Sequence, residues 1–117
     1  MKRGSRAKVL MVKPSESPHG IQGIADGKDF LASSEDMDSI INVGTEESIN
    51  RAKEFIKKTG LLVGISSGGN ILAAERYVAA KDPVGIVVTM LCDRGERYMS
   101  IYEATISVTK SHRYKVV

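Results

Sequence analysis

An uncharged apolar run, GIVVTML at residues 85–91, most constrains what this chain can fold into. Its β-branched residues and lack of charge are typical of a central strand of a parallel sheet, which is buried on both faces. Shorter apolar runs at 8–12 and 40–43, and the segment GLLVG before residue 65, predict further buried segments. Helical patterns separate these runs. The alternation predicts an α/β fold with three layers, a mainly parallel sheet flanked by helices.

Two helices are predicted between the apolar runs. Thr45 is predicted to cap the first, acidic residues follow it, and apolar residues recur at helical spacing until Gly60 ends the helix. The second is predicted from about Ser67 to Ala80, before Asp82 and the proline that follows it. Residues 14–30, rich in Pro, Gly, Ser and Asp, are predicted to form an irregular loop.

Size and composition narrow the function classes. With 117 residues the chain has room for one domain. A lone cysteine, Cys92, leaves no internal disulfide and fits a reducing, cytoplasmic compartment. His19 and His112 lie far apart without metal-ligand spacing, so no metal site is predicted. The net charge of +3 gathers at the two ends with no recognisable nucleic-acid module, and no apolar run approaches the roughly 20 residues of a membrane span.

The turn GISSGG, between an apolar run and an alanine-rich helix, is where chemistry is expected. It fits the serine-hydrolase pattern G-x-S-x-G, and Ser66, Asp93 and His112 follow the order of nucleophile, acid and base. The α/β-hydrolase fold needs a larger sheet than this chain can build and an upstream loop for the oxyanion hole, which argues against a hydrolase. A glycine-rich helix start could instead cradle an anion, or Ser66 or Ser67 could simply cap the helix. The pattern alone leaves the last two interpretations open.

Three stretches resemble one enzyme family in the family's own order. They are VKPSESPHGIQGIADG, TEESINRAKEFIKKTGLLVGISSGGNILAA and VVTMLCDRGERYMS. The chain resembles the C-terminal part of cysteine synthase (O-acetylserine sulfhydrylase), which together with cystathionine β-synthase belongs to the fold type II enzymes that depend on pyridoxal phosphate (PLP). The resemblance covers residues 1–100, which are predicted to form an incomplete piece of that fold. Residues 101–117 are predicted to be a divergent tail.

The resemblance implies a cofactor wall formed by Ser66, Gly64, Cys92 and Asp93. The family's serine at the position of Ser66 hydrogen-bonds the pyridine nitrogen, where many other PLP enzymes place an aspartate. Cys92 stands where the family usually has proline, and as a lone cysteine after an apolar strand it is predicted to be a small buried hydrophobe.

The loop motif GIQGIADG implies a substrate-side loop with Gln22 and Gly23. Ala25 stands where the family has a further glycine, and His19 is expected to order the loop. In the last motif, Glu96, Arg97 and Tyr98 are expected to form a structural cluster of ion pairs and hydrogen bonds.

The family's cofactor-binding lysine and its phosphate loop belong upstream of the match. No lysine here corresponds to the catalytic one, so no catalytic residue is assigned and the chain alone is expected to be inactive and to bind PLP poorly. The implied partners are a small amino-acid substrate in a complete enzyme and either a complementary N-terminal half or a second copy. The alternative is a non-catalytic interaction module that docks on a full-length or complementary synthase chain.

Overall fold

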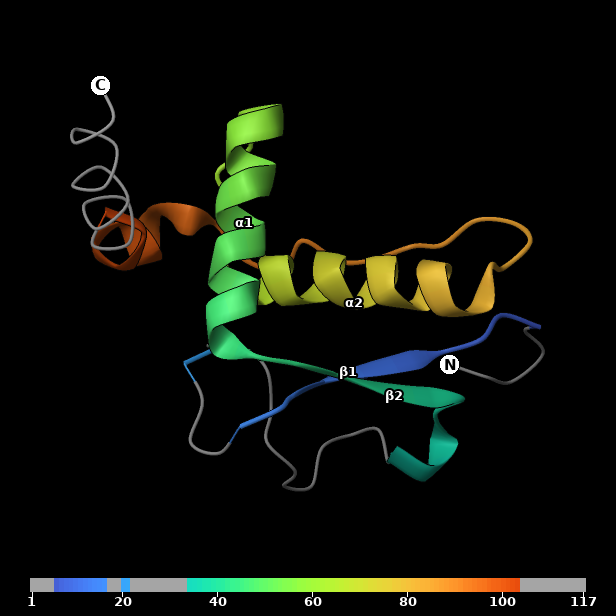
Figure 1. Cartoon of the computed structure of the whole chain (residues 1–117). Coiled ribbons are helices and arrows are strands. Elements are labelled where there is room, and N and C mark those ends of the chain that lie inside the picture. The colour runs from blue at the N-terminus through green and yellow to red at the C-terminus, as the bar shows by residue number, and fades with distance from the viewer. Residues whose placement is uncertain (1–5, 17–19, 22–33, 104–117) are drawn as a thin grey trace.

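The computed structural model describes residues 6–16, 20–21 and 34–103. The elements are β1 (Leu10–Pro14), a 3-10 turn η1 (Ser34–Asp36), β2 (Ser39–Val43), α1 (Thr45–Thr59), α2 (Ile65–Lys81) and a 3-10 turn η2 (Gly95–Tyr98), after which residues 99–103 are also helical (Figure 1). The predicted α/β class is confirmed. None of the described helices is both long and apolar enough to cross a membrane.

Strands β1 and β2 pair in parallel, with Leu10 opposite Ser39 and Pro14 opposite Val43. Asp38 fixes the start of the pairing: its backbone N–H donates to Val9 O at 2.8 Å, and its carboxylate accepts from Val9 N at 2.7 Å. The apolar runs at 8–12 and 40–43 therefore both form strands, shifted by one or two residues from the predicted bounds.

The start of α1 differs from the prediction. Gly44, rather than Thr45, is the N-cap, and the Glu47 side chain accepts the Gly44 N–H at 2.6 Å. The Glu47 carboxylate satisfies the backbone N–H of the N-cap residue itself, as the N3 residue of a capping box does, whereas glycine has no side chain for the free N–H groups of the first turn. The end agrees with the prediction, because Gly60 adopts the left-handed conformation with φ 76°.

Helix α2 begins two residues earlier than predicted, at Ile65, with Gly64 as its N-cap. Ser66 and Ser67 therefore lie inside its first turn, and no side chain caps the helix. The helix ends where Asp82 turns left-handed with φ 41°.

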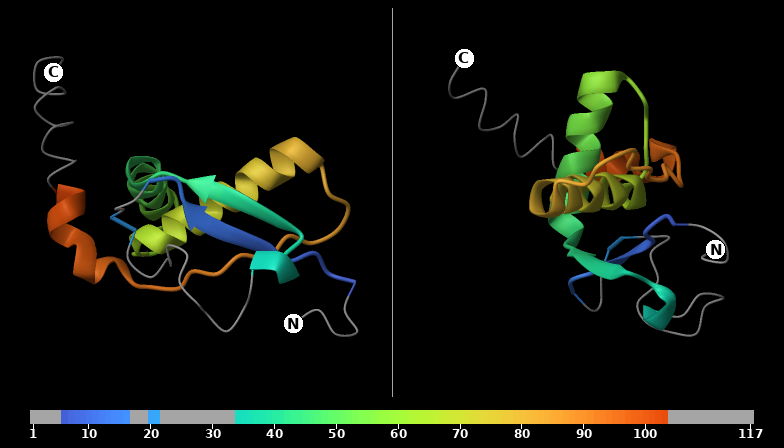
Figure 2. Two further views of the ribbon diagram at one scale, coloured as in Figure 1. Left: turned by 90° about the horizontal axis from the view of Figure 1, so that it is seen from below. Right: turned by 90° about the vertical axis from the view of Figure 1, so that its right-hand side faces the viewer.

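The two helices cross at a steep angle (Figure 2). A Cβ on Gly68 would lie 2.1 Å from the Ser48 backbone oxygen and 2.8 Å from the Ala52 backbone nitrogen. Because only hydrogen occupies that space, the start of α2 packs directly on the backbone of α1.

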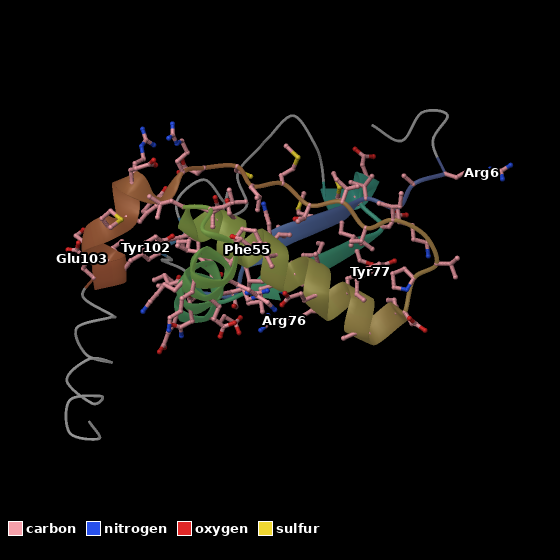
Figure 3. All side chains as sticks on the ribbon, turned by 90° about the horizontal axis from the view of Figure 1, so that it is seen from above. Arg6, Phe55, Arg76, Tyr77, Tyr102 and Glu103 are labelled. Carbon is pink, nitrogen blue, oxygen red and sulfur yellow. The ribbon has the colours of Figure 1, made fainter. Side chains whose placement is uncertain are left out.

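Ion pairs at exposed positions add to this crossing. Arg76, labelled in Figure 3, pairs with Glu47 and donates to the backbone oxygen of Asn42 at 2.9 Å. Arg51 on α1 pairs with Glu75 on α2. These contacts orient α2 relative to both α1 and the end of β2.

One apolar core joins these elements. Its buried members are Ile21, Val43, Ala52, Val63, Ile65, Ala73, Tyr98 and Tyr102. Side chains of the strands and of both helices pack around it, so the sheet, the helix crossing and the C-terminal turn share one interior.

The strongest predicted strand is not a strand in this structure. Residues 85–91 form no β-ladder with any described residue, and they are exposed. In Figure 1 the segment turns back along α2, on the opposite side of that helix from the β1–β2 ribbon. The segment before α2 contributes one isolated antiparallel bridge, between Val63 and Arg94. Residues 85–91 have high β-propensity, but a strand also needs a second strand with which to pair.

Candidate functional site

The first turn of α2 holds two buried hydroxyl groups. Ser66 is 2% exposed and Ser67 is fully buried. Within the described part of the chain, neither Oγ has a hydrogen-bond partner. The capping interpretation is therefore wrong for both serines, because a capping hydroxyl accepts a backbone N–H at the helix end.

A buried hydroxyl without a partner carries a cost of about 1–3 kcal/mol, so such groups are rare and call for an explanation. Ser66 lies at the second position of α2, where backbone N–H groups have no partner within the helix. The site thus offers a neutral hydroxyl beside unpaired helix N–H donors.

Gly64 joins the start of α2 to the turn after residue 92. Its N–H donates to the Asp93 backbone oxygen at 2.8 Å. A Cβ on Gly64 would come within 2.9 Å of the Tyr98 ring and 3.0 Å of Asp93 Cβ. The sequence implied a role for Gly64 in cofactor binding, and the structure shows a packing reason for glycine at this position. Gly64 and Asp93 are therefore in contact, and Gly64 lies two residues before Ser66 in the chain.

The carboxylate of Asp93 is already engaged. It accepts from the Tyr98 hydroxyl at 2.6 Å and from the Arg94 backbone N–H at 2.9 Å. The Tyr98 hydrogen bond, followed by that of Arg94, lowers the pKa of Asp93 below its ordinary value. Burial, together with the neighbouring carboxylate, raises the pKa of Tyr98. Asp93 is thus held as an anion by the residue five positions after it.

Cys92 is exposed, which contradicts its predicted burial. The apolar run before it has no partner strand to cover it, so the residue that ends the run also remains open. The Asn70 side chain donates to Met90 O at 2.9 Å and reaches Cys92 Sγ at 3.4 Å. Cys92 is therefore held over the second turn of α2, the same helix that carries Ser66.

A second tyrosine supports the site from the C-terminal side. Tyr102 is buried and donates to Val63 O at 2.9 Å, and its ring lies 6.4 Å from that of Tyr98 (Figure 3). Burial raises the pKa of Tyr102 to about 12. Sequence reasoning missed this residue because it follows residue 100, where the resemblance ends. The sequence did offer one signal, because Tyr102 lies four positions after another aromatic residue, Tyr98.

Several residues of the predicted substrate-side loop and of the hydrolase interpretation lie outside the part of the chain that the structure describes. Gln22, Gly23, His19 and Ala25 lie outside the described residues, as does His112 of the hydrolase interpretation. Next to them, Gly20 N donates to the Thr45 hydroxyl at 3.0 Å and Ile21 is buried. In the last motif, Glu96 pairs with Arg94 at 3.1 Å.

No protein-family profile matches the chain. It is 45% identical over 94 residues to cysteine synthase B of Campylobacter jejuni, covering 78% of this chain and 30% of that protein. It is 37% identical over 119 residues to a cysteine synthase of Buchnera aphidicola from Acyrthosiphon pisum, covering 86% and 37%. The chain therefore spans about a third of the length of these curated relatives.

Solved structures give the same assignment. The crystal structure of a cysteine synthase from Entamoeba histolytica aligns with a TM-score of 0.72 and 34% identity, over 80% of this chain and 31% of that one. An O-acetylserine-dependent cystathionine β-synthase from Helicobacter pylori aligns with a TM-score of 0.69 and 30% identity, over 80% and 33%. By sequence and by fold, the chain belongs to the cysteine synthase and cystathionine β-synthase family of fold type II PLP-dependent enzymes, and it corresponds to the C-terminal part of such an enzyme.

Proposed function

We propose that this chain forms one wall of the active site of a PLP-dependent cysteine synthase. The reaction is β-replacement, in which sulfide displaces the leaving group of O-acetylserine or a related activated serine. The place of Ser66 in the matched motif GISSGG carries the proposal, and its hydroxyl, in the first turn of α2, has no hydrogen-bond partner among the described residues. We assign that hydroxyl to the pyridine nitrogen of the cofactor.

The residues present fit that end of the cofactor. A serine hydroxyl can donate to or accept from a ring nitrogen, and it is neutral. The cofactor, when bound, supplies an electron sink for the substrate's α-carbon, and a neutral partner keeps that sink milder than an aspartate would. A mild sink suits replacement at the β-carbon, because the departing group carries the electrons away.

The chain's own contacts hold Ser66 in place. The Gly64–Asp93 backbone bond and the Tyr98–Asp93 hydrogen bond fasten the start of α2 to the turn after Cys92. A positioned hydrogen-bond partner loses less entropy when the ligand arrives, so these contacts preorganise the ring-binding end of the site.

The rest of the machinery belongs to the upstream part of the enzyme. In the family, the lysine that binds the cofactor and moves the α-proton, and the loop that cradles its phosphate, precede the stretches matched here. This chain by itself is therefore proposed to be inactive as a synthase and to hold PLP only weakly.

The proposal is tested in a fusion that supplies the missing part covalently. This chain replaces the matching 94-residue region of the Campylobacter jejuni relative, behind that protein's own upstream part. The expected fusion binds PLP, seen by its visible absorbance, and forms cysteine from O-acetylserine and sulfide. Ser66→Ala is expected to lower kcat/KM by about 10²–10³-fold and to shift the cofactor's absorbance and fluorescence.

Ser67→Ala is the matched control, since Ser67 is equally buried and also lacks a partner. It is expected to leave the cofactor's spectrum unchanged. An unaltered spectrum and rate in Ser66→Ala, or equal effects in both variants, would overturn the assignment of Ser66.

A second candidate function is a non-catalytic module that docks on a full-length synthase. The exposed apolar segment at 84–91 favours some form of docking. Binding of this chain to an intact synthase, together with a fusion that never binds PLP, would favour this candidate over the first.

A further inference from the structure

The side chain of Asn70 joins α2 to the chain that returns after the helix. Its amide nitrogen donates to Met90 O at 2.9 Å and lies 3.4 Å from Cys92 Sγ. The Cys92 thiol in turn donates to Met90 O at 3.8 Å. An asparagine amide has two N–H donors, and here one nitrogen uses both on a stretch of three residues. The thiol is therefore held between the Asn70 side chain and the backbone of Met90.

The helix end of this contact is firmly placed. At Gly68, two residues before Asn70, α2 lies directly on the backbone of α1, because a Cβ there would come within 2.1 Å of the Ser48 backbone oxygen. The returning chain is held less firmly. Among the described residues it makes no backbone–backbone hydrogen bond between 83 and 92. Asn70 is therefore the point at which the helix holds the returning chain before Asp93.

Ser66 and Asn70 share one face of α2. They are four positions apart in the helix, so their side chains lie one above the other, about one turn or ~5.4 Å apart along the axis. Asn70 thereby brings the thiol of Cys92 to the face that carries the Ser66 hydroxyl. Sulfur is polarizable and makes favourable contacts with aromatic rings. A hydroxyl and a thiol on one helix face fit a flat aromatic ligand.

We propose that Asn70 is a positioning residue, whose amide holds the Cys92 thiol beside Ser66 so that hydroxyl and thiol together receive the cofactor's ring. This inference rests on the proposed function and adds a residue to the ring-binding end of the site. Asn70 itself is assigned no contact with cofactor or substrate, so it acts through Cys92. A side chain that is already held in place loses less conformational entropy when a ligand arrives.

The first measurement uses the full chain without cofactor. NMR relaxation gives the backbone order parameters of residues 90–92 in wild type and in Asn70→Ala. Alanine has the highest helix propensity, so α2 is expected to stay intact while the returning chain loses both hydrogen bonds. The order parameters at 90–92 are expected to fall from about 0.85 to below about 0.6, and those at 66–69 to stay unchanged.

The second measurement uses the covalent fusion with the upstream part of the Campylobacter jejuni relative, loaded with PLP. Asn70→Ala is expected to shift the cofactor's absorbance and fluorescence and to lower kcat/KM by about 10-fold, because the thiol is no longer held at the ring. In a Cys92→Ala background the same substitution is expected to shift the spectrum much less. A residue that acts through the thiol has little left to position once the thiol is gone.

Two further variants separate the hydrogen bonds from the bulk of the side chain. Asn70→Asp keeps the shape but places a carboxylate oxygen where the donor was, facing Met90 O, so it is expected to act at least as strongly as Asn70→Ala in both measurements. Asn50→Ala is the matched control, because it removes the same group from an exposed position of α1. It is expected to match wild type in order parameters and spectrum.

The outcomes are distinct. Lower order parameters at 90–92, with a spectral shift that depends on Cys92, support the inference. Unchanged order parameters, an unchanged spectrum, or an equal shift in the Cys92→Ala background would each overturn it and leave the assignment of Ser66 standing. A wild-type fusion that binds no PLP would overturn the proposed function, and this inference with it.

Discussion

The α carbon of Gly68 on α2 faces the backbone oxygen of Ser48 on α1 so closely that a Cβ there would lie 2.1 Å from that oxygen. The contact lies two residues after Ser66, and it sets how deeply the serine turn sits against α1. A glycine in a motif associated with cofactors thus has a structural task, which is to let two helix backbones meet.

Gly68→Ala is expected to lower the free energy of unfolding by about 1–3 kcal/mol, because the added methyl group forces the helices apart by more than its better helix propensity returns. Urea unfolding followed by circular dichroism measures the change. Gly44→Ala is the control, since its Cβ would meet only the flexible Glu47 side chain at 3.3 Å; alanine is a poorer N-cap than glycine, so a cost of about 0.5–1 kcal/mol is expected. Equal losses in both variants would contradict the close approach.

Ser66→Ala is expected to leave the stability of the isolated chain unchanged or to raise it by about 1 kcal/mol. Its hydroxyl is buried without a partner, so removing it ends a desolvation cost and breaks no hydrogen bond within the described structure. Thermal unfolding of the variant beside wild type measures this. A clear loss of stability would mean that the hydroxyl has a partner inside the chain and is not reserved for a ligand.

Tyr102→Phe is expected to destabilise the chain by about 1 kcal/mol at neutral pH, since the hydrogen bond to Val63 O is lost. In wild type the pKa of Tyr102 is raised to about 12 from an ordinary 10.0. Burial of the neutral hydroxyl is the main cause of this shift, so wild type is most stable below pH 10 and loses stability as the pH rises towards 12. The advantage of wild type over Tyr102→Phe in urea midpoint should therefore shrink and then reverse as the pH rises from 10 to 12, and a constant difference would argue against titration of Tyr102.

Tyr98→Phe is expected to return the pKa of Asp93 towards its ordinary value of 3.8, because the hydroxyl that lowers it is gone. Because the pKa of Asp93 is lower in the folded chain than in the unfolded chain, its carboxylate stabilises the fold at pH values above the unfolded-state pKa. This stabilisation is lost as the pH falls through the folded-state pKa. The variant should thus be less stable than wild type near neutral pH, with a gap that closes in strong acid. NMR titration of the Asp93 carboxyl carbon measures the shift directly, and an unchanged midpoint would count against this hydrogen bond.

Local patterns predicted much of the scaffold. The apolar runs at 8–12 and 40–43 become β1 and β2, and Gly60 ends α1 with the left-handed conformation that its position predicts. The helix starts were less accurate. Thr45 and Ser67 are both good capping residues, but in each case an earlier glycine with an extended backbone is the N-cap, so Thr45 and Ser67 lie inside their helices.

The motifs themselves determined the family, since chemistry needs particular residues at particular spacings and these remain readable in the order of the chain. Only the tertiary structure decided that the buried Ser66 hydroxyl has no partner among the residues described, that Asp93 accepts from Tyr98, and that Tyr102 belongs to the core. It also decided that residues 84–91, despite strand-forming residues, lie open. Burial and pairing depend on which segments meet in space, and a strand forms only where another strand offers its backbone.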